Sequence, residues 1–132
     1  MKVLVDTCIW SLALRKGQNI HNPHVLELHR LIDDVRVQMI GPIRQEILSG
    51  ITSKSQFEKL RTYLSAFPDL PLEKSDYELA AEYFNINRSK GIQGSNTDFL
   101  IFAVSYRHKM PIFTCDKDFE SYRKNIPIEL HT

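Results

Sequence analysis

The chain is poor in cysteine, in long apolar runs and in charge of one sign, and each shortage excludes a class of protein. Its 132 residues include two cysteines, too few for a disulfide framework. No apolar run approaches the roughly 18 residues of a membrane span, and Asp6 interrupts the first apolar segment too early for a signal-peptide core. The 17 basic and 16 acidic residues leave a net charge of +1, which argues against nucleic-acid binding by bulk charge. We expect a cytoplasmic protein without a membrane segment.

The composition is that of an ordinary folded domain. Hydrophobic residues make up 42% of the chain and charged residues 25%, unlike the low hydrophobicity and high charge of disordered chains. A chain of this length buries roughly two-thirds of its unfolded surface, which is enough for stability without disulfides. Because the sequence shows no repeat, low-complexity tract or linker, we predict a single domain over residues 1–132.

Predicted strands and helices alternate along the chain. Apolar runs predict strands over residues 2–5, 37–40, 111–114 and 126–130, with an edge strand at 69–70 between two prolines. Helical spacing and end signals predict helices over residues 7–14 (closed by 15–17), 23–35, 43–48, 57–67, 75–87, 99–104 and 116–122. Ser75 and Glu78 have the spacing of a capping box. This alternation predicts an α/β fold, a three-layer α/β/α sandwich around a parallel sheet of four to five strands.

Four acidic residues are predicted to meet at one edge of that sheet. Asp6 and Asp116 each directly follow a predicted strand, at the carboxyl end where parallel α/β sheets bind ligands. Asp98 begins an apolar helix that descends about as far as the next strand climbs back, which returns it to the same edge. Glu46 lies one turn into the helix that follows the second strand. The sequence therefore predicts a cluster of carboxylates.

Clustered carboxylates repel one another and raise each other's pKa, and a divalent cation among them removes this cost. Oxygen ligands without a nearby set of histidines and cysteines favour Mg²⁺ or Mn²⁺ over zinc. Such an ion suits phosphodiester hydrolysis, because it lowers the pKa of a water and neutralises charge on the phosphoryl oxygens. The predicted chemistry is metal-dependent cleavage of a nucleic acid.

These motifs resemble those of the PIN-domain ribonucleases, and closely the VapC toxins of bacterial and archaeal toxin–antitoxin pairs. The likeness extends from residue 2 to residue 130. Each motif is weak alone, while the four in this order and spacing are fairly specific. They are Val-Leu-Val-Asp6-Thr7, Glu46 within Gln-Glu-Ile-Leu, Asp98 at the start of an apolar helix, and Thr114-Cys115-Asp116-Lys117-Asp118-Phe119.

The resemblance implies a catalytic centre and a biological setting. It implies that Mg²⁺ or Mn²⁺ is held by the four acids, and that the strand-end hydroxyl of Thr114 holds a metal-bound water. It also implies endoribonuclease activity on structured RNA such as tRNA, a homodimer, and inhibition by a cognate VapB-like antitoxin. Asp118 competes with Asp116 for the fourth ligand position, and Thr7 is expected to orient a ligand. The metal ligands carried over are Asp6, Glu46, Asp98 and Asp116.

Basic residues near the predicted acids are candidates for contacts with RNA phosphate. Arg88 and Lys90 lie in the polar segment that leads to Asp98. Arg44 and Lys117 neighbour predicted site acids and are candidates for neutralising charge in the transition state. Most such basic residues in proteins simply face solvent.

Several alternatives remain open at this level. Each acid taken alone is explained as a helix cap, and two of the five histidines are candidates for a metal-free acid and base. A structure-specific DNA nuclease of the PIN type and a catalytically silent RNA-binding or interaction module also fit the sequence. Cys8 and Cys115 are expected to be small buried fillers that approach each other if their strands are neighbours.

Overall fold

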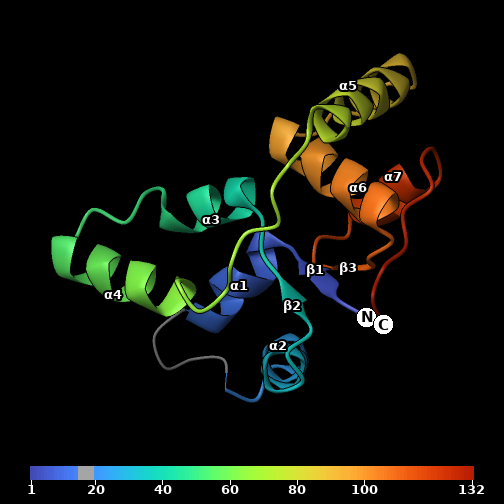
Figure 1. Cartoon of the computed structure of the whole chain (residues 1–132). Coiled ribbons are helices and arrows are strands. Elements are labelled where there is room, and N and C mark those ends of the chain that lie inside the picture. Colours follow the sequence, from blue (N-terminus) through green and yellow to red (C-terminus); the bar gives the residue numbers. More distant parts are fainter. Residues whose placement is uncertain (15–19) are drawn as a thin grey trace.

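Three parallel strands form the centre of the molecule (Figure 1). The computed structural model describes residues 1–14 and 20–132. In the order β2-β1-β3, β1 (Val3–Val5) pairs with β2 (Val37–Gln38) on one side and with β3 (Ile112–Phe113) on the other. Every residue of β1 is inaccessible to solvent, as expected for a parallel strand that is covered on both faces.

The helices divide into two groups because the chain crosses the sheet twice, in opposite directions. The first crossover joins β1 to β2, and the second returns past β1 to β3. Right-handed crossovers in opposite directions run over opposite faces, and Figure 1 shows α2 on one side of the strands and α6 on the other. The helices are α1 (Thr7–Leu14), α2 (Pro23–Asp33), α3 (Gly41–Leu48), α4 (Lys54–Leu64), α5 (Lys74–Ser89), α6 (Asn96–His108) and α7 (Phe119–Arg123).

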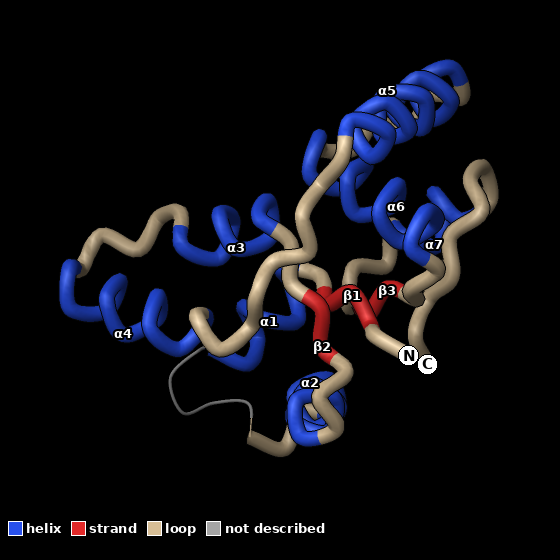
Figure 2. The backbone as a smooth tube through the Cα atoms, in the orientation of Figure 1, coloured by secondary structure: helices blue, strands red, loops and turns tan. Residues whose placement is uncertain are grey.

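The α/β class and the parallel sheet match the prediction, but the strand number does not. In Figure 2 the strands are few and short, and the predicted strands at 69–70 and 126–130 appear as loop. Each contributes only an isolated parallel bridge, Met39 with Asp69 and Ile112 with Leu130. Prolines lie within or beside both segments and lack the N–H that extends a ladder. In the described part of the chain the sheet therefore has three strands rather than four or five.

Several helix ends also differ from prediction, and the structure gives a physical reason at α5 and α2. The capping box of α5 does not use Ser75: the backbone N–H of Glu73 donates to Asp76 Oδ2 over 2.8 Å. Val35 lies beyond α2, is exposed and has a left-handed φ of 56°, so it does not continue the apolar stripe. The first helix has the predicted bounds, while residues 15–17, predicted to close it, lie outside the described residues.

Helix α6 passes through the core, as its apolar sequence predicts. Its residues 99 and 101–105 are all buried. Phe99 packs edge-on against Phe102 and against Tyr122 of α7, with ring centroids 5.6 and 5.7 Å apart. Helix α5 covers its outer side (Figure 1). This packing fixes the first turn of α6, and with it Asp98, relative to the sheet.

In the described part of the chain, no helix is long and apolar enough to cross a membrane.

Candidate active site

An acidic cleft of about 570 Å³ lies at the carboxyl ends of β1 and β3. All four acids predicted to converge line it, and no Lys, Arg or His is among its described lining residues. The cleft thus concentrates negative charge without a cationic side chain to balance it. The lining residues are Asp6, Thr7, Cys8, Ser11, Pro42, Gln45, Glu46, Ser49, Thr97, Asp98 and Asp116.

Asp6 is the most deeply placed of these acids, with 6% of its surface exposed. It directly follows β1, and its backbone N–H donates to Phe113 O of β3 over 2.9 Å. Its Oδ1 accepts from the Thr7 N–H at 2.8 Å, and its Oδ2 accepts from the Thr114 hydroxyl at 2.9 Å. Burial raises its pKa, and the charge of Glu46 raises it further, against the hydrogen bonds from its neighbours.

Glu46 reaches the cleft from α3. Its Oε1 accepts a hydrogen bond from the Thr7 hydroxyl over 2.5 Å. Thr7 is the first residue of α1, so this bond joins the N-terminal turn of α1 to the middle of α3. Thr7, which we expected to orient a ligand, therefore contacts Glu46 in the structure.

Asp98 both caps its helix and faces the cleft. In the capping box of α6, the Ser95 N–H donates to Asp98 Oδ2 over 3.3 Å, and the Asp98 N–H donates to Ser95 Oγ over 3.0 Å. Burial raises the pKa of Asp98 to about 6, with the negative charges of Asp6 and Asp116 adding to the shift. The helix-cap explanation is thus correct for Asp98 but incomplete, since capping does not account for the neighbouring charges.

The segment after β3 brings Asp116 to the cleft. Thr114 Oγ1 accepts from the Asp116 N–H at 3.0 Å, and Asp116 Oδ1 accepts from the Asp118 N–H at 2.9 Å. Asp118 is exposed and does not line the cleft, so the structure separates these two acids.

Cys8, which the sequence suggested only as a filler, also lines the cleft and contacts Asp6. Its sulfur lies 3.3 Å from Asp6 Oδ2. Burial and the Asp6 charge raise the pKa of the thiol, so the sulfur keeps its hydrogen. Its position two residues beyond Asp6, at the start of a helix, was the available signal for such a role. Ser95, three residues before Asp98, was likewise detectable as the first half of a capping box.

The donor set of the cleft fits a hard divalent cation. Carboxylate oxygens are the ligands that Mg²⁺ and Mn²⁺ prefer. Burial raises the pKa of Asp6 and of Asp98, the charges of neighbouring acids raise each further, and a cation in the cleft would favour the ionised forms. The acids stand apart on the cleft walls, because no three of them place ligand atoms within 4.8 Å of one another. Such spacing suits an ion that binds few protein oxygens and keeps several waters.

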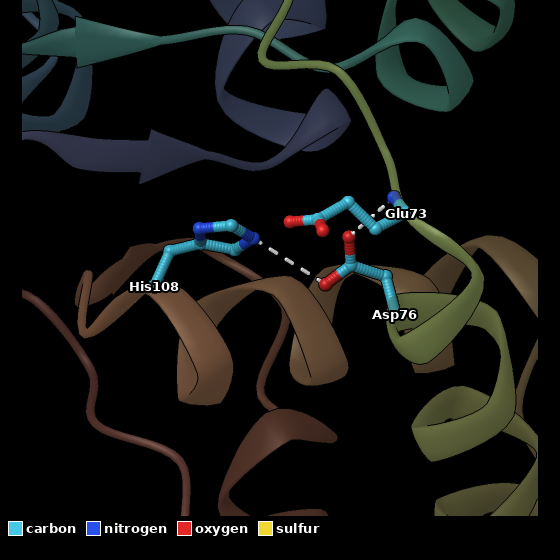
Figure 3. Close-up of side chains that lie close together, drawn as sticks. All are labelled: Glu73, Asp76 and His108. Atoms are coloured by element: carbon cyan, nitrogen blue, oxygen red, sulfur yellow. Dashed lines mark hydrogen bonds and ion pairs between the residues drawn. The ribbon is translucent and has the colours of Figure 1, made fainter.

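A different group, Glu73, Asp76 and His108, has ligand atoms within 4.8 Å of one another (Figure 3). It joins the N-terminus of α5 to the C-terminus of α6, at the other end of α6 from Asp98. Arg107 Nη1 lies 2.6 Å from Asp76 Oδ1 and 4.0 Å from Glu73 Oε1, so a cation is already present. Although burial raises the pKa of Asp76, the Glu73 N–H and Arg107 outweigh it and lower the pKa. This group is a structural ion pair.

The residues predicted to contact RNA phosphate differ in their surroundings: Arg44 is engaged within the fold, and the other three are exposed. Arg44 was predicted to contact RNA, but its guanidinium donates to Asp69 Oδ1 at 2.9 and 3.0 Å and to Leu64 O at 2.9 Å. It secures the end of α4 and the Asp69 bridge, a long-range role that short sequence spacing does not reveal. The exposed Arg88, Lys90 and Lys117 have cationic groups outside the cleft lining, and Arg88 lies 5.9 Å from the Phe84 ring centroid.

The histidines give no support to a metal-free acid–base pair at this cleft. All five lie in the described part of the chain, and none lines the cleft. His131 Nε2 instead lies 2.5 Å from Glu27 Oε2 of α2, and the His24 ring packs near Phe113. His108 belongs to the α5–α6 ion-pair group.

Comparisons with known proteins match this chain over most of its length. The PIN domain family model matches residues 3–125. VapC ribonuclease Mb1587 of Mycobacterium bovis and ribonuclease VapC11 of Mycobacterium tuberculosis are each 30% identical over 122 residues, covering 89% of this chain and 89% of the relative.

Solved structures share the fold at lower identity. VapBC2 from Rickettsia felis, bound to a DNA fragment from its promoter, has a TM-score of 0.77 at 19% identity, covering 99% of this chain and 98% of that one. FitAcB from Neisseria gonorrhoeae has a TM-score of 0.77 at 19% identity, covering 98% and 96%. VapBC-1 from nontypeable Haemophilus influenzae has a TM-score of 0.74 at 11% identity, covering 99% and 97%. With the family match and the curated relatives, this likeness in fold shows that the chain belongs to the PIN-domain family, in the branch of the VapC ribonucleases.

Proposed function

We propose that this chain is an endoribonuclease that depends on Mg²⁺ or Mn²⁺ and acts as the toxin of a type II toxin–antitoxin pair. One observation carries the proposal: the acidic cleft, lined by four carboxylates and by no basic residue among those described, lies where a parallel sheet binds its ligands. Family membership supplies the reaction class, because the curated relatives are named ribonucleases. We assign this activity to one nuclease domain over residues 1–132.

In this proposal the four cleft acids bind the cation, and the hydroxyls of Thr7 and Thr114 orient two of those acids by hydrogen bonds. Thr7 fixes Glu46, and Thr114 fixes Asp6 while accepting the amide of Asp116. When bound, the ion would supply a water of lowered pKa and positive charge beside the scissile phosphate. The chain's own contribution is to hold acids from four separate parts of the fold oriented and facing one cleft. The metal ligands are Asp6, Glu46, Asp98 and Asp116.

The proposed setting follows from the relatives and neighbours. VapBC2 and VapBC-1 were solved as complexes, and FitAB was solved bound to a DNA fragment. By analogy we propose a cognate VapB-like antitoxin, a homodimer, a structured RNA such as tRNA as substrate, and action in the cytoplasm. Exposed Arg88, Lys90 and Lys117 are proposed to contact RNA backbone outside the cleft. Arg44 is withdrawn from this role because its guanidinium is already engaged.

The test compares substrates and metals on the purified chain. We expect cleavage of tRNA with Mn²⁺ or Mg²⁺, no cleavage with EDTA, and recovery when the metal is restored. Preference for flap or single-stranded DNA over RNA would instead identify a DNA nuclease. RNA binding that EDTA leaves unchanged, without cleavage under any metal, would identify a silent RNA-binding module and overturn the proposal.

A further inference from the structure

The sulfur of Cys8 lies at the point where the β1–α1 junction meets the end of β3. It is 3.3 Å from Asp6 Oδ2, 3.4 Å from Thr114 Oγ1 and 3.2 Å from the backbone nitrogen of Cys115. Two of these contacts cross from one end of the chain to the other. A small apolar filler would need none of them.

Donor and acceptor chemistry fixes the direction of the two bonds that this sulfur makes with Asp6 and with Cys115. An ionised carboxylate only accepts, so the Cys8 S–H donates to Asp6 Oδ2. The Cys115 amide can only donate, so the sulfur accepts from it. The Thr114 hydroxyl gives its one hydrogen to the same Asp6 oxygen and accepts from the Asp116 N–H. The result is a closed set of hydrogen bonds that ties Asp6 to the segment carrying Asp116.

These bonds occupy most of the accepting capacity of Asp6. A carboxylate offers about four lone-pair sites, two on each oxygen. Among the described residues, Oδ2 accepts from both Cys8 and Thr114, whereas Oδ1 accepts from the Thr7 N–H alone. One site therefore remains open, and it is on Oδ1.

One open site has a consequence for the choice of cation. Ca²⁺ accepts carboxylates through one or both oxygens in a flexible shell, whereas Mg²⁺ requires near-octahedral geometry and binds few protein oxygens. A carboxylate that offers a single lone pair suits the second kind of ion. Without the Cys8 hydrogen, Oδ2 would regain a lone pair, and Asp6 would be able to chelate through both oxygens.

We propose that Cys8 is a positioning residue that leaves Asp6 one open lone pair, on Oδ1, and so makes the cleft prefer Mn²⁺ and Mg²⁺ to Ca²⁺. The inference rests on the proposed function, since it requires that Asp6 hold the cation. Cys8 itself is given no ligand role, because its S–H is directed to Asp6 Oδ2 and its sulfur accepts from the Cys115 N–H.

The substitutions that separate this role from simple packing are Cys8→Ser, Cys8→Val and Cys8→Ala. Serine keeps a donor at the same place, valine keeps the bulk without a donor, and alanine keeps neither. A filler role predicts that valine is tolerated best and serine worst, whereas a positioning role predicts the reverse. Cys115→Ala is the matched control, because it removes the neighbouring thiol, which also interacts with Cys8, and keeps the backbone N–H that donates to the Cys8 sulfur.

The readout is Mn²⁺ binding without RNA, followed by the electron paramagnetic resonance signal of free Mn²⁺, with Ca²⁺ as competitor. We expect Cys8→Val and Cys8→Ala to bind Mn²⁺ about 10-fold more weakly, as is common when a partner of a metal ligand is lost. In both variants, Ca²⁺ should displace Mn²⁺ at lower Ca²⁺ concentrations than in wild type. Cys8→Ser and Cys115→Ala should resemble wild type. If alanine prevents folding, judged by near-ultraviolet circular dichroism, the valine variant decides.

The Asp6→Asn variant separates failure of this inference from failure of the proposed function. Mn²⁺ binding by Asp6→Asn at wild-type strength would remove Asp6 from the metal centre and overturn both. Loss of binding in Asp6→Asn, together with wild-type affinity and wild-type Ca²⁺ competition in Cys8→Val, would overturn the Cys8 inference alone.

Discussion

The hydroxyl of Thr7 donates to Glu46 Oε1 over 2.5 Å, linking the first turn of α1 to α3 across the cleft. We predict that Thr7→Val, which keeps the shape and removes the donor, lowers RNA cleavage about 10-fold through misorientation of Glu46. The free energy of unfolding should change by only about 1 kcal/mol, since a single hydrogen bond at the surface is lost. Thr7→Ser should retain most activity, because it keeps the hydroxyl. Equal losses of activity in the valine and serine variants would show that the hydroxyl is not the cause.

Asp98 is expected to oppose folding while serving the cleft. Its pKa is about 6 in the folded chain, above its ordinary value of 3.8, so the folded state binds the extra proton between these values. Stability therefore falls as pH rises from about 4 to about 6, and the penalty is fully present at neutral pH.

Asp98→Asn removes that penalty and keeps an oxygen for the Ser95 N–H. In EDTA at pH 7 we predict a gain of about 1–2 kcal/mol in the free energy of unfolding, after allowance for solvent screening, with loss of cleavage. Urea unfolding of wild type and variant between pH 4 and pH 7 measures the gain. Curves that keep the same separation across this range would refute the assignment.

The Arg107–Asp76 pair is predicted to stabilise the fold without serving catalysis. Asp76 is fully buried, and Arg107 lies 2.6 Å from it. Arg107→Ala leaves this charge unpaired, so we expect a loss of about 3 kcal/mol in the free energy of unfolding. Because the pKa of Asp76 is lowered below 3.8, its stabilisation is present above that pH and is lost as pH falls below it.

Thermal unfolding and cleavage by the folded variant test this separation. Activity per folded molecule should stay at the wild-type level, since the pair lies at the far end of α6 from Asp98. Zn²⁺ should not raise the melting temperature of wild type through this group, because Arg107 already occupies it. A Zn²⁺-dependent rise that disappears in Asp76→Asn would identify a metal site there instead.

Gly94 allows the loop before α6 to approach α7. A Cβ at this position would lie 2.5 Å from the Tyr122 hydroxyl oxygen and 3.1 Å from Phe99. We predict that Gly94→Ala costs about 1–3 kcal/mol and lowers cleavage, because the shifted loop carries the Ser95 cap of Asp98. The double variant with Tyr122→Phe, which removes that oxygen, should recover part of the loss. A purely additive double-mutant cycle would contradict the contact.

What the sequence predicted best was what local chemistry determines. The bounds of α1, the buried character of α6 and the return of Asp98 to the sheet edge follow from propensity, apolar pattern and the rise of helices and strands. The tasks of Arg44 and Asp76 were missed because each depends on a partner 20 or more residues away. Similarly, Cys8 acquires its contacts only when β3 pairs beside β1. The segments predicted as strands at 69–70 and 126–130 lie parallel to the sheet but make only isolated bridges, because prolines within or beside them lack the N–H that extends a ladder.

The most direct test of the central claim compares RNA cleavage by variants substituted at two neighbouring acids, Asp116 and Asp118. Asp116 lines the cleft, and Asp118, two residues on, does not. With tRNA and saturating Mn²⁺, Asp116→Asn should lose at least about 100-fold in rate, as should Asp6→Asn, while Asp118→Asn keeps the wild-type rate. Wild-type cleavage by Asp6→Asn or Asp116→Asn, with each variant folded, would contradict the assignment of the acidic cleft as the catalytic centre.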